Sequence, residues 1–320
     1  MSRRTPRFIH AHQPDSHDER EAAIAGLRRT PAEASPKYFY DRLGSHLFDA
    51  ITELPEYYPT RTEAAIFAAH GAAMASCVGG GAVFIDLGAG NCAKAARLLP
   101  LLDPARYVAV DISADYLQDS LRQLQREHPA LDIVGIGMDF STSPALPSGV
   151  IPGDARPVFF YPGSSIGNFT PAAAESFLAG VRAQAAGGGL LIGVDLVKPR
   201  AVLEAAYDDA LGVTAAFNLN LLRHMNRLVG TDFDPTAWRH VALFNEAESR
   251  IEMHLEARRP LAVRWAGGER SFAAGERLHT ENSYKYTTGS FDALLQRAGF
   301  HHNRCWISPD RWFAVFWAQA

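Results

Sequence analysis

One stretch constrains the fold more than any other: residues 82–91, which read AVFIDLGAGN. A short apolar run leads to Asp86, and two glycines follow one residue apart, Gly88 and Gly90. Such a run is typical of a buried parallel strand that enters a tight turn, where glycine lets the backbone approach a ligand closely. Because residues 93–99 are predicted to be helical, the turn lies at a helix N-terminus, where α/β sheets bind nucleotide-like ligands.

The glycine turn by itself is compatible with more than one interpretation. Gly88, Gly90 and Ala93 also fit the relaxed fingerprint of dinucleotide-binding proteins. An ordinary strand-to-helix turn without a ligand is a third interpretation of the same residues. The choice among them depends on the rest of the chain.

Two further predicted strands end in an acidic residue. Residues 107–111 form the second strand and end in Asp111, which is placed to accept hydrogen bonds from ribose hydroxyls. Residues 132–140 form the third strand. There Asp139 is placed to accept a hydrogen bond from an adenine amino group, and Phe140 to cover the ring. These side chains favour a nucleoside-containing ligand.

A fourth strand, residues 157–161, leads into a loop that faces the predicted ligand crevice. Thr170 and Pro171 fit the N-cap and the first position of the next helix, so the loop between is short and constrained. Asn168 lies on this loop, either as a ligand-binding residue or as a turn residue that bonds its own backbone. Residues 190–196 form the fifth strand.

Residues 54–63 precede the glycine motif and hold two tyrosines, Tyr57 and Tyr58, between two prolines. The prolines predict a rigid, non-helical loop. Thr62 is placed to cap the helix that follows, as far as about Ser76. The tyrosines either pack as core residues with solvated hydroxyls or line a binding site.

The alternation of strands and helices stops after residue 199 and resumes near the C-terminus. Residues 202–229 predict one or two long helices. Residues 250–257 alternate as a half-exposed strand, and residues 261–265 alternate likewise, which predicts a hairpin. An inserted second domain accounts for this interruption.

The C-terminal residues distinguish between the possible ligands. Residues 290–298 predict a helix with Ser290 as its cap, followed by strands at 302–307 and 312–317 that are joined by a tight turn. An antiparallel closing strand is typical of the sheet of S-adenosyl-L-methionine (SAM) methyltransferases, whereas dinucleotide dehydrogenases usually continue with strand–helix units. Asp86, the acid before the glycines, favours the same choice.

Charge and composition exclude several other classes. The net charge of −4 and the pI near 6.3 give no reason to expect nucleic acid or an anionic membrane as a partner. The three cysteines form neither metal spacing nor a disulfide framework, which favours the cytoplasm. The pairs His10 with His12 and His301 with His302 lack an acidic or cysteine partner at ligand spacing, so no metal site is predicted. Neither a signal peptide nor a membrane-spanning apolar run is apparent.

Seven longer segments carry a resemblance to a known family. They are SPKYFYD at 35–41, LPEYYPTRTE at 54–63, GSSIGNFTP at 163–171, AYDDA at 206–210, GVTAAFN at 212–218, RIEM at 250–253 and TENS at 280–283. Together they resemble the histidine Nα-methyltransferases of ergothioneine biosynthesis, from about residue 35 to the C-terminus. These enzymes trimethylate the α-amino group of L-histidine to hercynine and use three SAM molecules.

The resemblance implies an α/β fold: a Rossmann-like class I SAM methyltransferase sheet with an antiparallel last strand, plus a separate α+β substrate-binding domain. Residues 1–60 and 197–285 are expected to form the substrate-binding domain, and residues 61–196 and 286–320 the SAM-binding domain. The implied enzyme is a cytoplasmic monomer that acts on L-histidine, a small molecule, without a metal.

Site residues follow from the same resemblance, position by position. It assigns to SAM the residues Gly88, Lys94, Asp111, Asp139 and Phe140. It assigns Tyr57, Asn168 and Tyr207 to the amino-acid end of histidine and Glu281 and Ser283 to the imidazole, and it places Asn282 at the border of the side-chain pocket. Near the same pocket it places Gly163, Met253, Tyr40 and Phe48. No catalytic residue is assigned beyond those that position the substrate.

Other functions stay open on the sequence. One is a related SAM-dependent N-methyltransferase that acts on another aromatic amino acid or on a histidine derivative. A dinucleotide oxidoreductase would give a nicotinamide absorbance change and would not bind S-adenosylhomocysteine. A non-catalytic SAM-binding module would bind SAM without turnover of any amino acid.

Overall fold

The apolar run before the glycines folds as β3 (Val83–Leu87), which is buried along its whole length. It pairs in parallel with β4 (Arg106–Asp111) on one side and with β6 (Pro157–Tyr161) on the other. The chain thus leaves β3 in one direction for β4 and returns to its other side for β6. At such a switch point the carboxyl ends of the strands leave a crevice that binds ligands.

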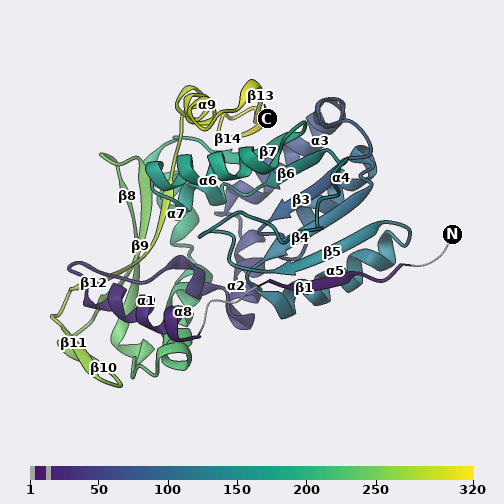
Figure 1. The fold of residues 1–320 in the computed structure, drawn as a ribbon. Coiled ribbons are helices and arrows are strands. Elements are labelled where there is room, and N and C mark those ends of the chain that lie inside the picture. The colour runs from purple at the N-terminus through teal and green to yellow at the C-terminus, as the bar shows by residue number, and fades with distance from the viewer. Residues whose placement is uncertain (1–3, 12–15) are drawn as a thin grey trace. The chain divides into compact units, whose positions relative to one another are not determined.

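The computed structural model describes residues 4–11 and 16–320, and the chain divides into two compact units (Figure 1). Unit 1 comprises the described part of Met1–His12 together with Pro59–Val197 and Lys285–Ala320. Unit 2 comprises the described part of Gln13–Tyr58 together with Lys198–Tyr284. Within the described residues we find no helix whose length and apolar character would let it span a lipid bilayer.

Within the described residues of unit 1, a sheet of eight strands runs in the order β1-β5-β4-β3-β6-β7-β14-β13. The remaining strands are β1 (Arg7–His10), β5 (Asp132–Gly137), β7 (Gly189–Asp195), β13 (His301–Ile307) and β14 (Phe313–Gln319). The strands from β1 to β7 are parallel, and β14 runs antiparallel to both β7 and β13. The sheet of a class I SAM methyltransferase, with its antiparallel last strand, is thereby confirmed.

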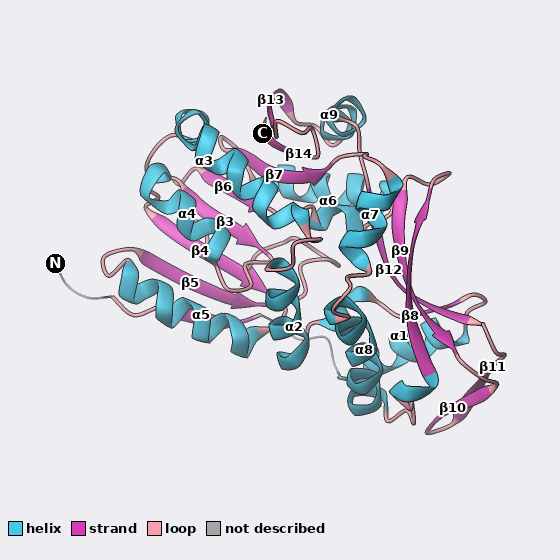
Figure 2. Cartoon of the chain, turned by 180° about the vertical axis from the view of Figure 1, so that it is seen from behind, coloured by secondary structure: helices cyan, strands magenta, loops and turns pink. Residues whose placement is uncertain are grey.

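Helices cover both faces of this sheet, as Figure 2 shows. On one face lie α3 (Tyr58–Val78), α4 (Ala93–Leu102) and α5 (Ala114–Glu127), and on the other lie α6 (Pro171–Gln184) and α9 (Thr288–Arg297). The core under the first three helices joins their apolar faces to the strands, with Phe67, Leu98, Leu121, Phe84, Tyr107 and Phe160 among its members. Burial on both faces explains why the parallel strands read as continuous apolar runs.

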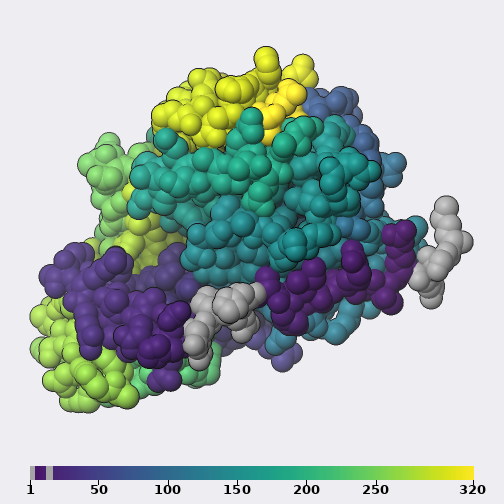
Figure 3. All heavy atoms as spheres, viewed as in Figure 1, coloured from purple at the N-terminus to yellow at the C-terminus, as the bar shows by residue number. Residues whose placement is uncertain are grey.

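The first strand differs from the expectation. The sequence placed residues 1–60 with the insertion, but Arg7–His10 form β1, which pairs in parallel with β5 at the edge of the large sheet. Figure 3 shows these residues on the surface of unit 1. An edge strand needs only one partner and one buried face, so this polar segment carries little sequence signal. His12 of the pair His10/His12 lies outside the described residues.

Unit 2 is built on a second sheet in the order β2-β12-β9-β8. Its strands are β2 (Ala32–Glu33), β8 (Trp238–Asn245), β9 (Arg250–Ala257) and β12 (Arg277–Tyr284). The helices of the unit are α1 (Ser16–Arg28), α2 (Arg42–Thr52), α7 (Arg200–Tyr207) and α8 (Val213–Val229), of which α7 and α8 pack on β8 and β9. The separate α+β unit of the expected fold is therefore present, and its role in substrate binding stays a proposal.

Several local predictions were wrong, among them Thr62 as a helix cap, since Thr62 lies inside α3. The segment 54–63 is not a loop throughout, because α3 begins at Tyr58. Pro59 then occupies the first turn of the helix, where its missing N–H removes no hydrogen bond. The strand β10 (Leu261–Trp265) pairs with β11 (Gly268–Phe272) and not with β9. Helix α9 is capped by Thr287, and Ser290 completes a capping box from inside the helix.

The capping box of α9 gives a first prediction. The Thr287 hydroxyl accepts from the Ser290 N–H, and the Ser290 hydroxyl accepts from the Thr287 N–H, both at 3.0 Å. We expect Thr287→Ala to lower the free energy of unfolding by about 1 kcal/mol, because a helix N–H loses its acceptor. Urea denaturation measures the change. The neighbouring Thr288→Ala, which removes no cap, is the control and should differ little from the parent.

Candidate active site

The glycine turn after β3 depends on a carboxylate from the next strand. Gly88 has φ of 73° and Gly90 has φ of 51°, both in the left-handed region that favours glycine. The Gly90 N–H donates to Asp111 Oδ2 at 2.9 Å, and the Ser113 N–H donates to Asp111 Oδ1 at 2.8 Å. A Cβ on Gly90 would meet no atom within 4 Å. The turn is therefore held by Asp111, and no protein atom fills the space beside the Gly90 Cα, as the binding of a ligand requires.

Asp111 keeps acceptor capacity beyond these two bonds. Each carboxylate oxygen has two lone pairs, so the ribose hydroxyls expected from the sequence still have acceptors. Burial raises the pKa of Asp111, while the backbone N–H groups of Ser113 and Gly90 oppose the rise because they bind the charged form. The residue therefore fits both roles, anchor of the turn and acceptor for a diol.

The residues after β5 lie beside the same turn. The Phe140 ring lies 3.5 Å from the position that a Cβ on Gly88 would take, and it meets the Tyr161 ring edge-on at 5.8 Å. Asp139 Oδ1 accepts from the Ser141 N–H at 3.0 Å and from the Ser141 hydroxyl. The structure thus brings Gly88, Asp111 and Phe140 together around one opening. That set fits the adenosine part of SAM: acceptors for hydroxyls, a ring to stack on, and backbone without side chains.

Asp86 lies in β3, just before the glycine turn, and it is buried. The Tyr107 hydroxyl donates to Asp86 Oδ2 at 2.7 Å. Burial raises the pKa of Asp86 to about 7, since the Tyr107 hydrogen bond and the Lys94 charge only partly offset desolvation and the nearby Asp111 and Glu63 charges. Asp86 is therefore a buried acid with a raised pKa, and the hydrogen bond from Tyr107 holds its side chain inside the protein.

Lys94 lies in the first turn of α4 and pairs with a carboxylate that the sequence did not single out. Its Nζ lies 2.7 Å from Glu63 Oε2, and Glu63 Oε1 accepts from the Gly163 N–H at 2.9 Å. Glu63 is the last residue of the segment 54–63, where a loop was expected, so no periodicity pointed to its burial. The only sequence signal for the burial of Glu63 is its position directly before the apolar run at residues 64–68.

Asn168 ends a short 3-10 helix, η2 (Ser165–Asn168), in the loop after β6. This loop is anchored at its start: besides the Gly163 bond, Ser164 Oγ accepts from the Asp195 N–H at 2.9 Å. Gly163 has φ of 76°, and Ser164 also adopts a left-handed φ of 61°. The structure therefore holds Asn168 in unit 1, on a constrained loop above the strands that end at the glycine turn.

In unit 2, aromatic rings follow one another from η1 (Pro36–Phe39) to α7. Tyr40 meets Phe48 edge-on at 5.9 Å, Phe48 meets Tyr57 at 6.2 Å, and Tyr57 meets Tyr207 at 6.4 Å. Phe217 of α8 packs on Tyr40 and Phe48 at 5.8 and 6.0 Å. The structure brings together four residues that the resemblance assigned, and it adds Phe217, which sequence reasoning missed although it lies in the quoted segment 212–218.

Strand β12 presents Glu281 and Ser283 on one face. Both are buried, and they pair with Met253 and Ile251 of β9 in the antiparallel register. Ser283 Oγ lies 2.7 Å from the Tyr207 hydroxyl. A bulge at Thr280 precedes Glu281, and the Thr280 hydroxyl donates to the Met253 carbonyl at 3.0 Å. The bulge sets which residues of the strand face α7.

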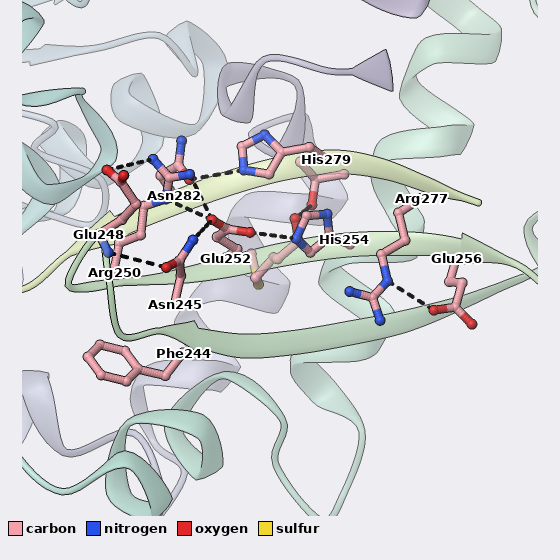
Figure 4. A network of polar contacts seen from close by, with 12 residues as sticks. Phe244, Asn245, Glu248, Arg250, Glu252, His254, Glu256, Arg277, His279 and Asn282 are labelled. Carbon is pink, nitrogen blue, oxygen red and sulfur yellow. Dashed lines mark hydrogen bonds and ion pairs between the residues drawn. The ribbon is translucent and has the colours of Figure 1, made fainter. Parts of the chain in front are cut away.

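Asn282, which the resemblance grouped with Glu281 and Ser283, lies on the opposite face of β12 from these two residues. Successive side chains of a strand point to opposite faces, and Figure 4 shows Asn282 among charged residues. Its Oδ1 lies 3.0 Å from His279 Nε2. In the same network Glu252 accepts from Asn245 at 2.9 Å and lies 3.1 Å from His254 Nε2. Asn282 therefore supports the back of the sheet.

His240 of β8 holds the backbone of Tyr207. Its Nε2 lies 2.8 Å from the Tyr207 carbonyl, which can only accept, so Nε2 carries the proton. Its Nδ1 then accepts from the Asn218 amide at 2.8 Å, and the same amide group donates to the His254 carbonyl at 3.1 Å. Burial lowers the pKa of His240, which keeps the ring neutral. Neither His240 nor its role was expected from the sequence.

Comparison with known proteins decides the family. Residues 19–320 match the family described as histidine-specific methyltransferase, SAM-dependent. The chain belongs to this family. Among the described residues, no group of three or more His, Cys, Asp or Glu side chains is placed to hold a metal ion. SAM is the cofactor of this family, and the residues around the glycine turn fit it.

Individual members of the family are similar along most of the chain. The histidine N-alpha-methyltransferase of Mycolicibacterium smegmatis is 41% identical over 292 residues, 89% of each chain. The protein of that name from Mycobacterium tuberculosis is 42% identical over 296 residues, 90% of each chain. Ergothioneine biosynthesis protein 1 of Neurospora crassa is 32% identical over 289 residues, which cover 86% of this chain and 32% of that protein.

The raised pKa of Asp86 predicts a pH dependence of stability for this histidine-specific methyltransferase. Below about pH 4 the residue is protonated in the folded and the unfolded chain. Between about pH 4 and 7 only the folded chain keeps the proton, so the free energy of unfolding falls as the pH rises. Above that range both states have lost it. Asp86→Asn removes this dependence and keeps an acceptor for Tyr107.

Urea denaturation of both proteins at pH 5, 6 and 8 measures the effect. Between pH 5 and 6 the parent should lose about 1.4 kcal/mol more per pH unit than Asp86→Asn. Titrating groups that do not interact with Asp86 are common to the two proteins and cancel in the difference. Parallel stability curves would contradict the raised pKa.

Proposed function

We propose that this chain transfers methyl groups from SAM to the α-amino nitrogen of L-histidine three times, which gives hercynine, the first step of ergothioneine biosynthesis. The observation that carries the proposal is the match to histidine-specific, SAM-dependent methyltransferases over residues 19–320. Relatives named histidine N-alpha-methyltransferase and ergothioneine biosynthesis protein 1 support the substrate and the pathway.

Methyl transfer is an in-line displacement, and SAM supplies the electrophilic methyl group. The protein has to hold the amine in line and keep water out. Unit 1 contributes the residues proposed for the cofactor, Gly88, Lys94, Asp111, Asp139 and Phe140, and also Asn168. The glycine turn, the diol acceptors of Asp111 and the ring of Phe140 support these assignments.

The attacking amine must be neutral. An α-amino group has a pKa of about 8, so only part of it is free base at neutral pH. Asn168 and Tyr57 are proposed to hydrogen-bond the nitrogen as uncharged partners, which leaves a lone pair for the reaction. Tyr207 is proposed to bind the amino-acid end, and His240 holds the Tyr207 backbone in place. Solvent takes the proton before each round of transfer, so no dedicated base is assigned.

Each transfer brings the product closer to a permanent cation. Aromatic faces attract a methylated ammonium group through their quadrupoles. Tyr40, Phe48 and Tyr57 follow one another in unit 2 with ring centroids about 6 Å apart, and we propose that they accommodate the growing trimethylammonium group. Gly163 and Met253 are also proposed to take part in substrate binding, as the resemblance implies.

Glu281 and Ser283 are proposed to recognise the imidazole through hydrogen bonds. A carboxylate accepts from one ring nitrogen, and a hydroxyl donates to the other, which recognises the neutral ring in one tautomer. Both residues lie on one face of β12, and Ser283 is already hydrogen-bonded to Tyr207. A site that pairs both ring nitrogens rejects side chains that lack them, because its buried polar groups are then left unpaired.

The proposal includes a cytoplasmic monomer. The three cysteines, Cys77, Cys92 and Cys305, are all free, which suits a reducing compartment. Sedimentation of the purified chain tests the monomer.

Mass spectrometry of the purified chain with SAM and L-histidine tests the function directly. We expect the mono-, di- and trimethylated forms of histidine, with the trimethylated product at the end. Parallel incubations with L-tryptophan and L-tyrosine serve as controls and should give no product. Methylation of another amino acid, with histidine left unchanged, would favour the related N-methyltransferase instead.

Neighbouring residues of β12 provide a matched test of the imidazole assignment. We expect Glu281→Ala to weaken L-histidine binding roughly ten-fold or more, because a buried charged acceptor is lost, and to leave SAM binding within two-fold. Asn282→Ala, one position along but on the opposite face, should leave the affinities for both ligands unchanged. Calorimetric titration with each ligand measures the affinities. Equal losses of the two ligands in Glu281→Ala would count against the assignment.

A further inference from the structure

Glu63 is a buried carboxylate that the proposed function leaves without a role. It lies on α3 in unit 1, and its side chain is 1% exposed. Taking a carboxylate out of water costs several kcal/mol unless charged or hydrogen-bond partners replace the solvent. The formation of α3 by itself does not require a buried charge at this position.

The partners of Glu63 come from two distant segments that belong to the site. Oε2 lies 2.7 Å from Lys94 Nζ, at the start of the helix that follows the glycine turn. Oε1 accepts from the Gly163 N–H at 2.9 Å, at the start of the loop that carries Asn168. One carboxylate therefore joins the cofactor helix to the loop after β6.

The surrounding backbone is shaped to admit this carboxylate. A Cβ on Gly193 of β7 would lie 2.0 Å from Glu63 Oε1, and a Cβ on Gly163 would lie 2.7 Å from Lys94 Nζ. Contacts that short do not occur in proteins, so a side chain at either position would displace the carboxylate or the ammonium. The two glycines thus leave the space that the ion pair fills.

We propose that Glu63 is a positioning residue for the cofactor: it holds the Lys94 ammonium in place and fixes the Gly163 end of the Asn168 loop. Lys94 keeps 31% of its side chain exposed while Glu63 keeps almost none. The ammonium is thus anchored from inside the protein and remains accessible to a ligand from outside. The inference rests on the proposed function in two respects, that Lys94 contacts SAM and that Asn168 contacts L-histidine.

The variant Glu63→Gln separates the two proposed roles of Glu63, which are to position Lys94 and to anchor the Asn168 loop. In Glu63→Gln the amide oxygen must face the Gly163 N–H, because only that atom accepts. The amide nitrogen then faces Lys94 Nζ, donor against donor, and Lys94 is pushed away while the loop stays fixed. In Glu63→Ala both contacts are lost. Glu63→Gln should therefore affect SAM alone, and Glu63→Ala should affect SAM and histidine.

Calorimetric titration of the full chain with SAM, in the absence of histidine, is the test. We expect Glu63→Gln and Lys94→Met each to raise the Kd for SAM about ten-fold. The double variant should bind no more weakly than either single one, because both substitutions break the same interaction. Glu175→Gln removes the exposed ion pair of Glu175 with Arg297 and should leave the Kd unchanged.

Two outcomes overturn the proposal: an unchanged Kd for SAM in Glu63→Gln, with only a lower melting temperature, or losses that multiply in the double variant. If Glu63→Gln fails to fold, Glu63→Asp is titrated with SAM instead. This variant keeps the charge, but its side chain is too short to reach both donors. An unchanged Kd for SAM there also overturns the proposal. Failure of the proposed function would appear separately, as the absence of methylated histidine from a chain that binds SAM.

Discussion

The hydrogen bonds that Asp111 accepts at the end of β4 determine the shape of the glycine turn. Two glycines in left-handed conformations have no side chains with which to hold a turn in place, so the restraint has to come from elsewhere. Asp111 supplies it by accepting from the Gly90 N–H and from the Ser113 N–H. The turn after β3 and the start of α5, the helix after β4, are thereby joined through one carboxylate, while a Cβ on Gly90 would meet no protein atom within 4 Å.

Three acids lie around this turn, Asp86 and Glu63 buried and Asp111 half-buried, and each has a different partner. Asp86 has the Tyr107 hydroxyl, Asp111 has backbone N–H groups, and Glu63 has Lys94 and Gly163. The difference has a chemical consequence. A neutral donor leaves the Asp86 pKa raised to about 7, whereas the ammonium gives Glu63 a charged partner at 2.7 Å. A carboxyl group therefore anchors the turn (Asp111), has a raised pKa (Asp86) or forms half of an ion pair (Glu63), according to its neighbours.

The sheet of unit 2 separates two kinds of chemistry by the alternation of its strands. One face carries Glu281 and Ser283, both buried, and Ser283 is hydrogen-bonded to Tyr207. The other carries the network of Glu252, His254, His279 and Asn282 (Figure 4). Burial lowers the pKa of His254 to about 4, so that ring stays neutral and the Glu252 carboxylate is paired chiefly with Arg250. Polar groups behind the sheet thus stiffen the strand that presents the proposed ligand contacts.

The sequence alone determined the parallel sheet, the glycine turn, the antiparallel closing strand and the insertion, because apolar periodicity and glycine placement are local signals. It did not determine β8 or β12, whose polar residues form strands only because β9 lies between them. Nor could it place Asn282 behind the sheet, since the face depends on register and on the bulge at Thr280. Glu63, Phe217 and His240 became visible only in the tertiary structure, because their partners are distant in sequence and burial is a property of the folded chain.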